Sequence, residues 1–277
     1  MSKATPTTER LIQRLPLPSF PSVALQAMNT IESEAPALSR LSDIINTDAM
    51  LAAAVLRASN SALFHHSFPV RNIETAIQLL GMDRTTLLVS THATWQLLSR
   101  DVSPIIGRRW WRHNFVTALF AEHLGKQCHD SQPGYLPGLM HSIGQLALYQ
   151  SFPTDYLRLV LSPVAQLNGL FAAERNELAT DHCQLGAALL SKWKLPPHVI
   201  DAAAHHHLPH CAESSSTHLI HPSCLLANAT GFTVFPDQPG DTDSLPESAQ
   251  TLLGDHALCA AIAHTVATME SQLFPHS

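Results

Sequence analysis

Apolar residues recur every three or four positions along most of the chain, which is the spacing of one buried helix face. The pattern predicts helices over residues 22–31, 39–45 and 49–58, and two more over 73–81 and 83–98. Alternation of apolar and polar residues between tight turns, which would indicate β-strands, is nearly absent. About the first hundred residues are therefore expected to form a bundle of five helices, in a chain that is all-α throughout.

Residues with known capping preferences stand at several of these boundaries. Asp48 and Asn72 each precede an apolar-periodic segment, where a side-chain oxygen can accept hydrogen bonds from the first free N–H groups of a helix. Gly81 stands where a helix ends, because glycine adopts the left-handed conformation at little cost. Asp83 is placed to cap the helix that follows.

The second half of the chain continues the helical pattern after a joint at Ser103-Pro104. Further helices are predicted over residues 107–126, 138–150, 154–161, 170–180, 183–193, 197–207, 220–230 and 255–273. Thr154 is placed to cap one of them, and Pro197 is acceptable in the first turn of another.

Breaks in the pattern indicate how the chain is organised. Residues 133–137, 214–216 and 235–246 are expected to be a loop, a polar linker and a mobile loop. The predicted parts are a flexible N-terminus over 1–14, an N-terminal helical subdomain over 15–102, a second helical subdomain over 103–231, and a loop with a final helix over 232–277 that packs on the second subdomain.

Composition narrows the functional classes. Of 277 residues, 45% are apolar and 14% charged, with a formal net charge of −6 at pH 7. This balance lacks the basic footprint that direct nucleic-acid binding usually requires. The longest apolar runs are interrupted by Arg, Asp or His and fall short of the roughly 20 residues that cross a bilayer. Because the opening residues are polar and lack an apolar signal core, a cytoplasmic protein without membrane contact is expected.

Histidine and cysteine are the residue types in this chain best suited, by their number and chemistry, to form a binding or metal site. The chain has 18 histidines and five cysteines. The cysteines show no Cys-x-x-Cys spacing and are expected to be reduced and mostly structural. His141 lies in an apolar stretch, 138–146, whose helical spacing places it near the inward face of a short helix. A buried imidazole needs a hydrogen bond, a metal or a polar neighbour, so His141 is a candidate site residue.

Three linked patterns stand out in the first hundred residues. They are a Leu-Pro-x-Phe clasp over 17–20, an Asp-x-x-Leu-x-x-x-Val-Leu-Arg-x-Ser-Asn-Ser segment over 48–61, and an Ile-x-x-Ala-Ile-x-Leu-Leu-Gly segment over 73–81. Together they resemble the HDOD family, the HD-related output domains of bacterial signalling, over about residues 15–209 and more weakly to 231. The resemblance implies an HD-domain-like helical bundle with an N-terminal helical subdomain. It also implies a non-catalytic output or scaffold function that regulates processes such as motility, biofilm formation, virulence or gene expression.

The stretch around His141 resembles the His-Asp-x-Gly-Lys signature of the HD superfamily of metal-dependent phosphohydrolases, with two changes. Ser142 stands where that signature has the metal-binding Asp, and Gln145 where it has Lys. Carried over by position, the ligand order of the superfamily falls on His113, His141 with Ser142, His182, His206, His207 and Asn228. Both carboxylates are missing, although Mg²⁺ and Mn²⁺ prefer oxygen-rich ligand sets. The resemblance therefore implies no cofactor, or only a weak or adventitious divalent metal at His113, His141, His182 and His206.

These positions admit three interpretations. The one adopted is a vestigial pocket of buried, hydrogen-bonded imidazoles. The enzymatic alternative is a weak metal-dependent phosphohydrolase, because imidazoles can hold Zn²⁺, Ni²⁺ or Fe²⁺ without carboxylates. The third is a sensor that binds a small anion or nucleotide without cleaving it. The Gly-Tyr-Pro loop of the related cyclic-dinucleotide phosphodiesterases is absent after His206-His207, which disfavours that activity.

The expected partners are signalling proteins that act in trans, for example a response regulator, a diguanylate cyclase or a kinase. Candidate contact residues are Arg57 and Asn60, in the polar stretch 57–61, and the pair Trp110 and Trp111. The alternative interpretations are a turn of the N-terminal bundle for the first two and a core aromatic pair for the tryptophans.

Overall fold

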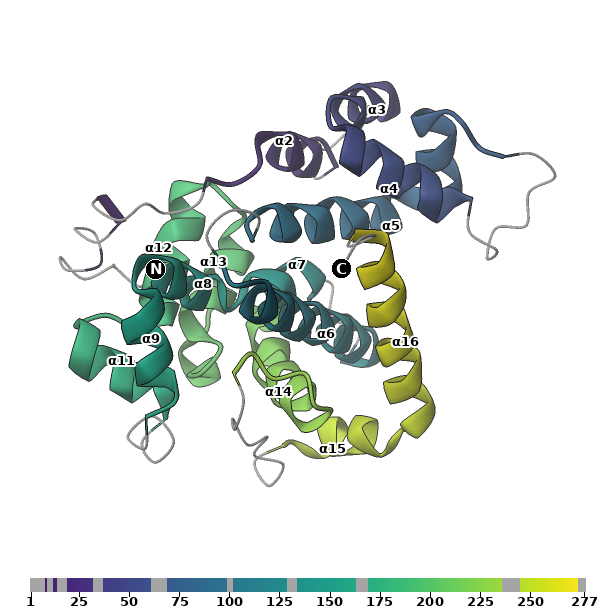
Figure 1. Cartoon of the computed structure of the whole chain (residues 1–277). Coiled ribbons are helices and arrows are strands. Elements are labelled where there is room, and N and C mark those ends of the chain that lie inside the picture. The colour runs from purple at the N-terminus through teal and green to yellow at the C-terminus, as the bar shows by residue number, and fades with distance from the viewer. Residues whose placement is uncertain are drawn as a thin grey trace. The chain divides into compact units, whose positions relative to one another are not determined.

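The computed structural model describes residues 8, 12–13, 19–31, 37–60, 69–98, 102–128, 134–162, 169–235 and 245–273. All regular elements among them are helices (Figure 1), so the predicted all-α fold is confirmed for this part of the chain. The chain divides into two compact units. The first comprises Met1–Pro18 and Arg100–Ala267, and the second comprises Ser19–Ser99 and Thr268–Ser277.

The second unit contains the helices of the N-terminal bundle. They are α2 (Ser22–Ile31), α3 (Leu38–Asn46), α4 (Ala49–Ser59) and α5 (Ile73–Gln96). Helices α2, α3 and α4 each pack against α5, and burial of Leu41, Ile45 and Leu51 makes the core between them. Asp48 caps α4 as predicted, because its Oδ1 accepts hydrogen bonds from the backbone N–H groups of Met50 and Leu51, both at 3.0 Å.

Helix α5 is bent at Gly81, where the backbone has φ 79° and ψ 167°. Asn72 caps its start as predicted, through a hydrogen bond from the N–H of Thr75. The two straight parts correspond to the two helices predicted on either side of Gly81, because only glycine tolerates this φ at low cost. Asp83 lies inside the second part and not before it, so its predicted capping role is wrong.

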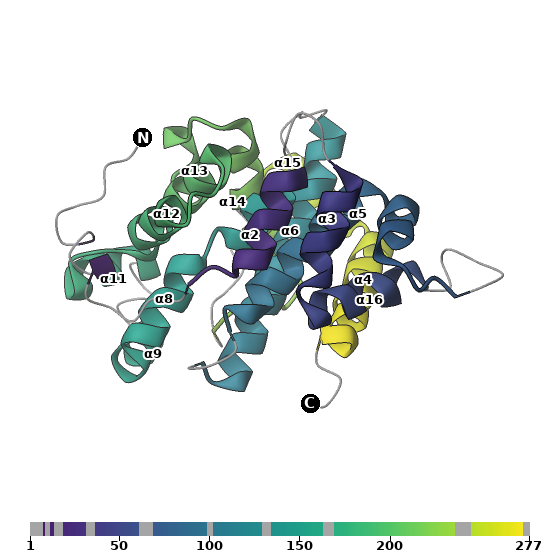
Figure 2. The ribbon, with the colours of Figure 1, turned by 90° about the horizontal axis from the view of Figure 1, so that it is seen from above.

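The first unit is built around α6 (Pro104–Cys128), which packs against α7 and α14 (Figures 1 and 2). Its side chains Trp111, Phe115 and Phe120 are completely buried. The remaining elements are α7 (Tyr135–Met140), α8 (Ile143–Ser151), α9 (Pro153–Val160), α11 (Leu170–Leu178), α12 (His182–Lys192), α13 (Pro197–His205), the short 3-10 helix η2 (Pro209–Cys211), α14 (Ser215–Ala229), α15 (Glu247–Gly254) and α16 (His256–Leu273). The residues of α16 from Thr268 onward are assigned to the second unit.

Several predicted boundaries in this unit are wrong. Helix α7 begins at Tyr135, inside the segment predicted as a loop, and Thr154 lies within α9 instead of capping it. The predicted polar linker 214–216 is the start of α14, where Ser216 is buried. Helix α15 was not predicted. Clasp residues 17 and 18 and residues 236–244 of the predicted mobile loop lie outside the described part of the chain.

Thr8 departs from the prediction of a flexible N-terminus. It is buried, and its Oγ1 lies 2.8 Å from Oγ1 of Thr180 and donates to Oε1 of Gln184 at 3.4 Å. This residue is therefore anchored to the start of α12 by hydrogen bonds.

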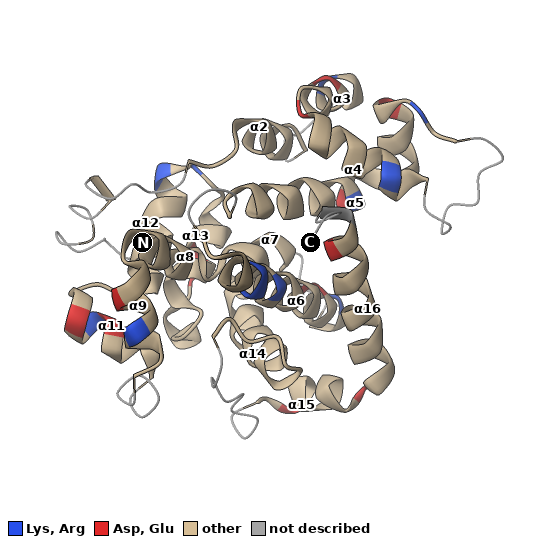
Figure 3. Ribbon diagram, in the orientation of Figure 1, with Lys and Arg blue, Asp and Glu red and all other residues tan. Residues whose placement is uncertain are grey.

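Charged side chains are sparse on the described elements. Figure 3 shows Lys and Arg on several separate helices, α6 among them. Arg108, Arg109 and Arg112 lie in the first half of α6. Among the described residues no single helix has the length and apolarity to cross a membrane; the bent pair α15 and α16 meets that test only when the two are joined.

Asp201 ties α13 to the start of α14. Its carboxylate accepts hydrogen bonds from the N–H groups of Glu213 (3.2 Å) and Ser214 (3.0 Å), from Oγ1 of Thr217 (2.7 Å) and from Nδ1 of His205 (2.8 Å). Burial acts to raise the pKa of Asp201. The hydrogen bonds from Thr217, Ser214 and Glu213 outweigh burial and hold this pKa below its ordinary value.

Replacing Asp201 by asparagine is expected to lower the free energy of unfolding at neutral pH by about 1–3 kcal/mol. Because the folded pKa lies below the unfolded value of about 3.9, the stabilisation is complete above that value and is lost as pH falls through the folded pKa. Urea unfolding from neutral pH down to about pH 3 should show the gap between the two proteins narrowing only in acid. A gap that stays constant in acid would contradict this assignment. Thr217→Val, which removes one donor, should give a smaller gap.

Candidate functional site

Five of the predicted histidines come together in the first unit. His113 belongs to α6, His141 lies between α7 and α8, His182 begins α12, and His206 and His207 follow α13. Their ring centroids lie 4.3–5.3 Å apart between neighbours, from His113 through His141 to His206, and among His182, His206 and His207. His207 is exposed, whereas the other four are buried.

His141 lies in a turn and not within a helix, which corrects the prediction. Helix α7 ends at Met140 and α8 begins at Ile143. Helix α8 then approaches α12 so closely that a Cβ atom on Gly144 would lie 1.9 Å from the carbonyl oxygen of His182. This backbone approach, which only glycine permits, brings His141 and His182 into one cluster.

All four buried histidines direct Nδ1 at an oxygen that can only accept a hydrogen bond. The distances are 2.8 Å from His113 to the Phe232 carbonyl, 2.8 Å from His141 to the Gly138 carbonyl, 3.1 Å from His206 to the Ala203 carbonyl, and 2.6 Å from His182 to Oε2 of Glu174. Each Nδ1 therefore carries the proton that it donates. In a neutral ring the lone pair is then on Nε2.

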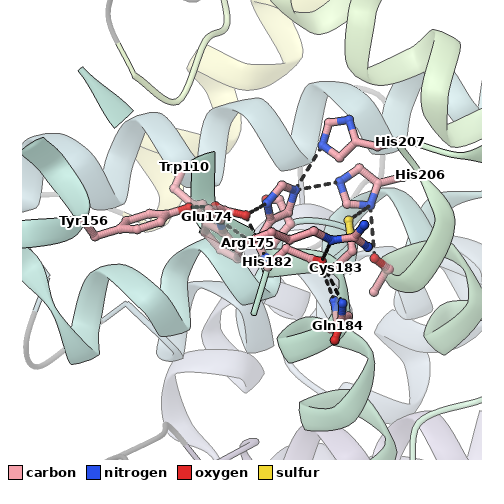
Figure 4. Close-up of polar contacts among 12 residues, drawn as sticks. Trp110, Tyr156, Glu174, Arg175, His182, Cys183, Gln184, His206 and His207 are labelled. Carbon is pink, nitrogen blue, oxygen red and sulfur yellow. Dashed lines mark hydrogen bonds and ion pairs between the residues drawn. The ribbon is translucent and has the colours of Figure 1, made fainter. Parts of the chain in front are cut away.

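The Nε2 atoms of three histidines converge (Figure 4). Nε2 of His182 lies 3.0 Å from Nε2 of His207 and 3.3 Å from Nε2 of His206. Bare lone pairs repel at these distances. At least one of these nitrogens must carry a proton, or the three must share a cation.

Glu174, on α11, is a site residue that sequence reasoning missed. Its side chain is fully buried and accepts hydrogen bonds from the Tyr156 hydroxyl (2.5 Å), the His182 N–H (2.9 Å) and His182 Nδ1 (2.6 Å) (Figure 4). The adjacent Arg175 pairs with Asp181 at 2.7 Å. The carboxylate of Glu174 thus supports His182 from the side opposite Nε2. The sequence signal was weak, because a glutamate on a polar helix face is ordinarily a solvent-exposed residue.

Burial and charge set the protonation of the cluster. Burial lowers the pKa of His113 to about 4 and that of His141 to about 3, so both are neutral at physiological pH. Burial also lowers the pKa of His206. At His182 burial acts in the same direction, but the negative charge of Glu174 outweighs it and raises the pKa well above its ordinary value.

Ser142 is part of a closed hydrogen-bond network. Its hydroxyl donates to Oδ1 of Asn114 (2.9 Å), its carbonyl accepts from Nε1 of Trp110 (3.1 Å), and Nδ2 of Asn114 donates to the Trp110 carbonyl (2.8 Å). Trp110 and its neighbour Trp111 are buried. The prediction of these tryptophans as partner contacts is therefore wrong, and the core-pair alternative describes them.

Two predicted pocket residues carry buried amide oxygens without a hydrogen-bond partner among the described residues. They are Oε1 of Gln145 and Oδ1 of Asn228. Asn228 is four residues after Cys224 on α14, and Sγ of Cys224 lies 3.5 Å from Nε2 of His113. Helical spacing places Asn228 on the same face of α14 as Cys224, and its place beside the histidines stays a prediction.

Comparison with known proteins identifies the family to which the chain belongs. The model of the HDOD domain matches residues 17–209, which is more than half of the chain. The chain belongs to the HDOD family. The resemblance predicted from the three N-terminal patterns is thereby confirmed.

Relatives of this HDOD protein match it at low sequence identity. An uncharacterized protein of Treponema pallidum (strain Nichols) is 29% identical over 211 residues, which cover 71% of this chain and 39% of that protein, so the chain spans only about two fifths of this relative. The structure of an HDOD domain protein of unknown function from Geobacter sulfurreducens has a TM-score of 0.73 at 20% identity and covers 98% of this chain and 88% of that one. A candidate phosphohydrolase from Shewanella amazonensis SB2B has a TM-score of 0.69 at 22% identity, with 97% and 96% covered.

Among the described residues, two groups of side chains have ligand atoms close enough to share a metal ion. One consists of His182, Cys183, His206 and His207, and the other of His113, His141 and Cys224; within each group all ligand atoms lie within 4.8 Å of one another. Neither group contains a carboxylate. Burial raises the pKa of the Cys183 thiol, and that of Cys224 to about 12. The cysteines were predicted to be structural, and only the tertiary structure brings them to the histidines.

The remaining candidate contact residues lie in the second unit. Asn60 is exposed, but its side chain bridges the chain to Val70: Oδ1 accepts from the Val70 N–H (2.7 Å) and Nδ2 donates to the carbonyls of Val70 and Leu56 (both 2.8 Å). These bonds agree with the alternative interpretation as a turn. Arg57 is exposed in the last turn of α4, and its contact role stays a prediction.

Proposed function

We propose that this HDOD domain is a non-catalytic signalling module that acts through contacts with other proteins. The main support for the proposal is the hydrogen bonding of Ser142. At the position where the resemblance to the HD superfamily expects a metal-binding aspartate, the hydroxyl is engaged by Asn114 and the carbonyl by Trp110. Ser142 lies in the turn before α8, is held to α6 by these two bonds, and offers no charge to a metal.

The ligand chemistry supports the absence of hydrolysis. Metal-assisted phosphate hydrolysis needs an ion that activates water and holds phosphate oxygens, and the hard ions that do this prefer oxygen ligands. Both ligand groups described above contain only imidazole and thiol. Glu174, the carboxylate nearest to them in the hydrogen-bond network, is occupied by Tyr156 and His182.

The proposed partners are signalling proteins that act in trans, such as a response regulator, a diguanylate cyclase or a kinase, and the proposed compartment is the cytoplasm. HDOD membership supports a signalling role, and the net charge of −6 disfavours nucleic acid as the target. The rival function is phosphohydrolysis, because the similar protein from Shewanella amazonensis SB2B is described as a candidate phosphohydrolase. At 22% identity that likeness concerns the fold.

The proposal predicts that the wild-type protein hydrolyses no phosphate ester with Mn²⁺, Mg²⁺ or Zn²⁺. Ser142→Asp combined with Asn228→Asp should acquire Mn²⁺ binding, because it adds the two carboxylates that a hard ion needs beside the imidazoles. Isothermal titration calorimetry measures Mn²⁺ binding. Assays with phosphomonoesters, phosphodiesters and cyclic dinucleotides measure hydrolysis. The matched control is Ser151→Asp, which adds a carboxylate at the end of α8. Metal-dependent turnover by the wild type would overturn the proposal.

A further inference from the structure

The group His182, Cys183, His206 and His207 has the composition of a closed zinc site. Zinc takes four nitrogen and sulfur ligands in tetrahedral geometry, and three imidazoles with one cysteine form such a set. Helix α12 begins with His182 and Cys183 and packs against α13, which ends just before His206 and His207. We infer that these four side chains bind one zinc ion, with Cys183 as a thiolate ligand.

The positions of the imidazoles fit this ion. Zinc–nitrogen distances of about 2.0–2.1 Å in a tetrahedral site place ligand nitrogens about 3.3 Å apart. Nε2 of His182 lies 3.3 Å from Nε2 of His206 and 3.0 Å from Nε2 of His207. An ion at this point would coordinate the converging Nε2 atoms in place of a shared proton.

The groups behind the ligands are those that metal sites use. A metal-binding histidine ordinarily donates its other ring N–H to a carboxylate or a backbone carbonyl, which fixes the ring and raises its basicity. His182 donates Nδ1–H to Glu174 at 2.6 Å, and His206 donates Nδ1–H to the Ala203 carbonyl at 3.1 Å. Glu174 and Cys183 stand at positions to which the resemblance to the HD superfamily assigns no ligand role.

Charge balance also favours a cation here. Glu174 is fully buried, and a buried carboxylate requires a nearby positive charge. The adjacent Arg175 is paired with Asp181 at 2.7 Å. Glu174 instead contacts His182, so a cation bound at Nε2 of that ring would compensate the carboxylate through the imidazole (Figure 4).

The four-residue group is favoured over the neighbouring group of His113, His141 and Cys224 for two reasons. It supplies four ligands where the other supplies three. It also has an exposed member, His207, through which an ion reaches the site from solvent. The inference goes beyond the proposed function. Four protein ligands leave no open position for substrate, so the ion stabilises or senses and does not hydrolyse.

The test is cobalt titration of the 277-residue chain, purified without a histidine tag and stripped with a chelator. One equivalent of Co²⁺ should produce the visible bands of a tetrahedral site and the near-ultraviolet band of a cobalt–thiolate bond, and Zn²⁺ should abolish both. Cys183→Ser should lose the thiolate band. The control Cys211→Ser, at an exposed cysteine, should retain it.

Three results would overturn the inference. They are a wild-type protein that gives no thiolate band, a band that survives in Cys183→Ser, and a band lost only in Cys224→Ser, which would place the ion beside His113. If the folded protein binds neither Co²⁺ nor Zn²⁺, the converging Nε2 atoms share a proton and not a metal ion. If circular dichroism shows that Cys183→Ser does not fold, X-ray absorption of the zinc-loaded wild type decides, through a sulfur neighbour at about 2.3 Å.

Discussion

Gly144→Ala is expected to lower the free energy of unfolding by about 3 kcal/mol or more. The new Cβ would lie 1.9 Å from the carbonyl oxygen of His182, 2.7 Å from its carbonyl carbon and 2.8 Å from the backbone nitrogen of Gly186. All three atoms are backbone, so no side-chain rotation relieves the clash, and α8 must move away from α12. Urea unfolding followed by circular dichroism measures the loss.

Gly254→Ala is the matched control for this substitution. Gly254 ends α15, and a Cβ there meets nothing within 4 Å. Its free energy of unfolding should stay within about 1 kcal/mol of wild type, because the change affects only backbone entropy and helix propensity. Equal stability of the two variants would show that α8 and α12 are not held as closely as described. Because Gly144 faces the backbone of His182, its alanine variant should also bind Co²⁺ more weakly.

Glu174→Ala is expected to cost about 3–5 kcal/mol of unfolding free energy, which is the range for removing one partner of a buried charged pair. The change leaves the Tyr156 hydroxyl and both the backbone N–H and Nδ1–H of His182 without their acceptor in a buried site. Thermal and urea unfolding of the metal-free protein measure this loss. The metal-free state separates it from any contribution of bound zinc.

Two further variants identify the cause of that loss. Glu122→Ala removes a carboxylate whose ion pair with Lys126 lies at the surface of α6, and should change stability by less than about 1 kcal/mol. Glu174→Gln keeps the shape and removes the charge. It should be less destabilising than alanine yet weaken Co²⁺ binding about 10- to 100-fold, as loss of a carboxylate behind a metal-binding histidine does. Unchanged stability of Glu174→Ala would show that this carboxylate is not needed in the core.

Rules based on neighbouring residues predicted several helix ends correctly. They failed where burial against another helix determined the local structure. Asp48 and Asn72 cap their helices because the cap depends on a side chain and the next three residues. The segment 214–216 was predicted as a linker because serine is common in polar turns. Ser216 instead lies buried in the first turn of α14, and no local pattern records which face of a helix another helix covers.

The amino-acid sequence alone was enough to predict the all-α class, the HDOD family and the histidines of the candidate site. Helical periodicity, caps and linked patterns are properties of neighbouring residues, and they survive without knowledge of the fold. The side chains that contact those histidines became known only from the fold. Glu174 reaches His182 because α11 and the start of α12 fold together, and Cys183 and Cys224 reach other imidazoles across helix contacts. Such contacts depend on packing between distant segments, for which one sequence holds no local signal.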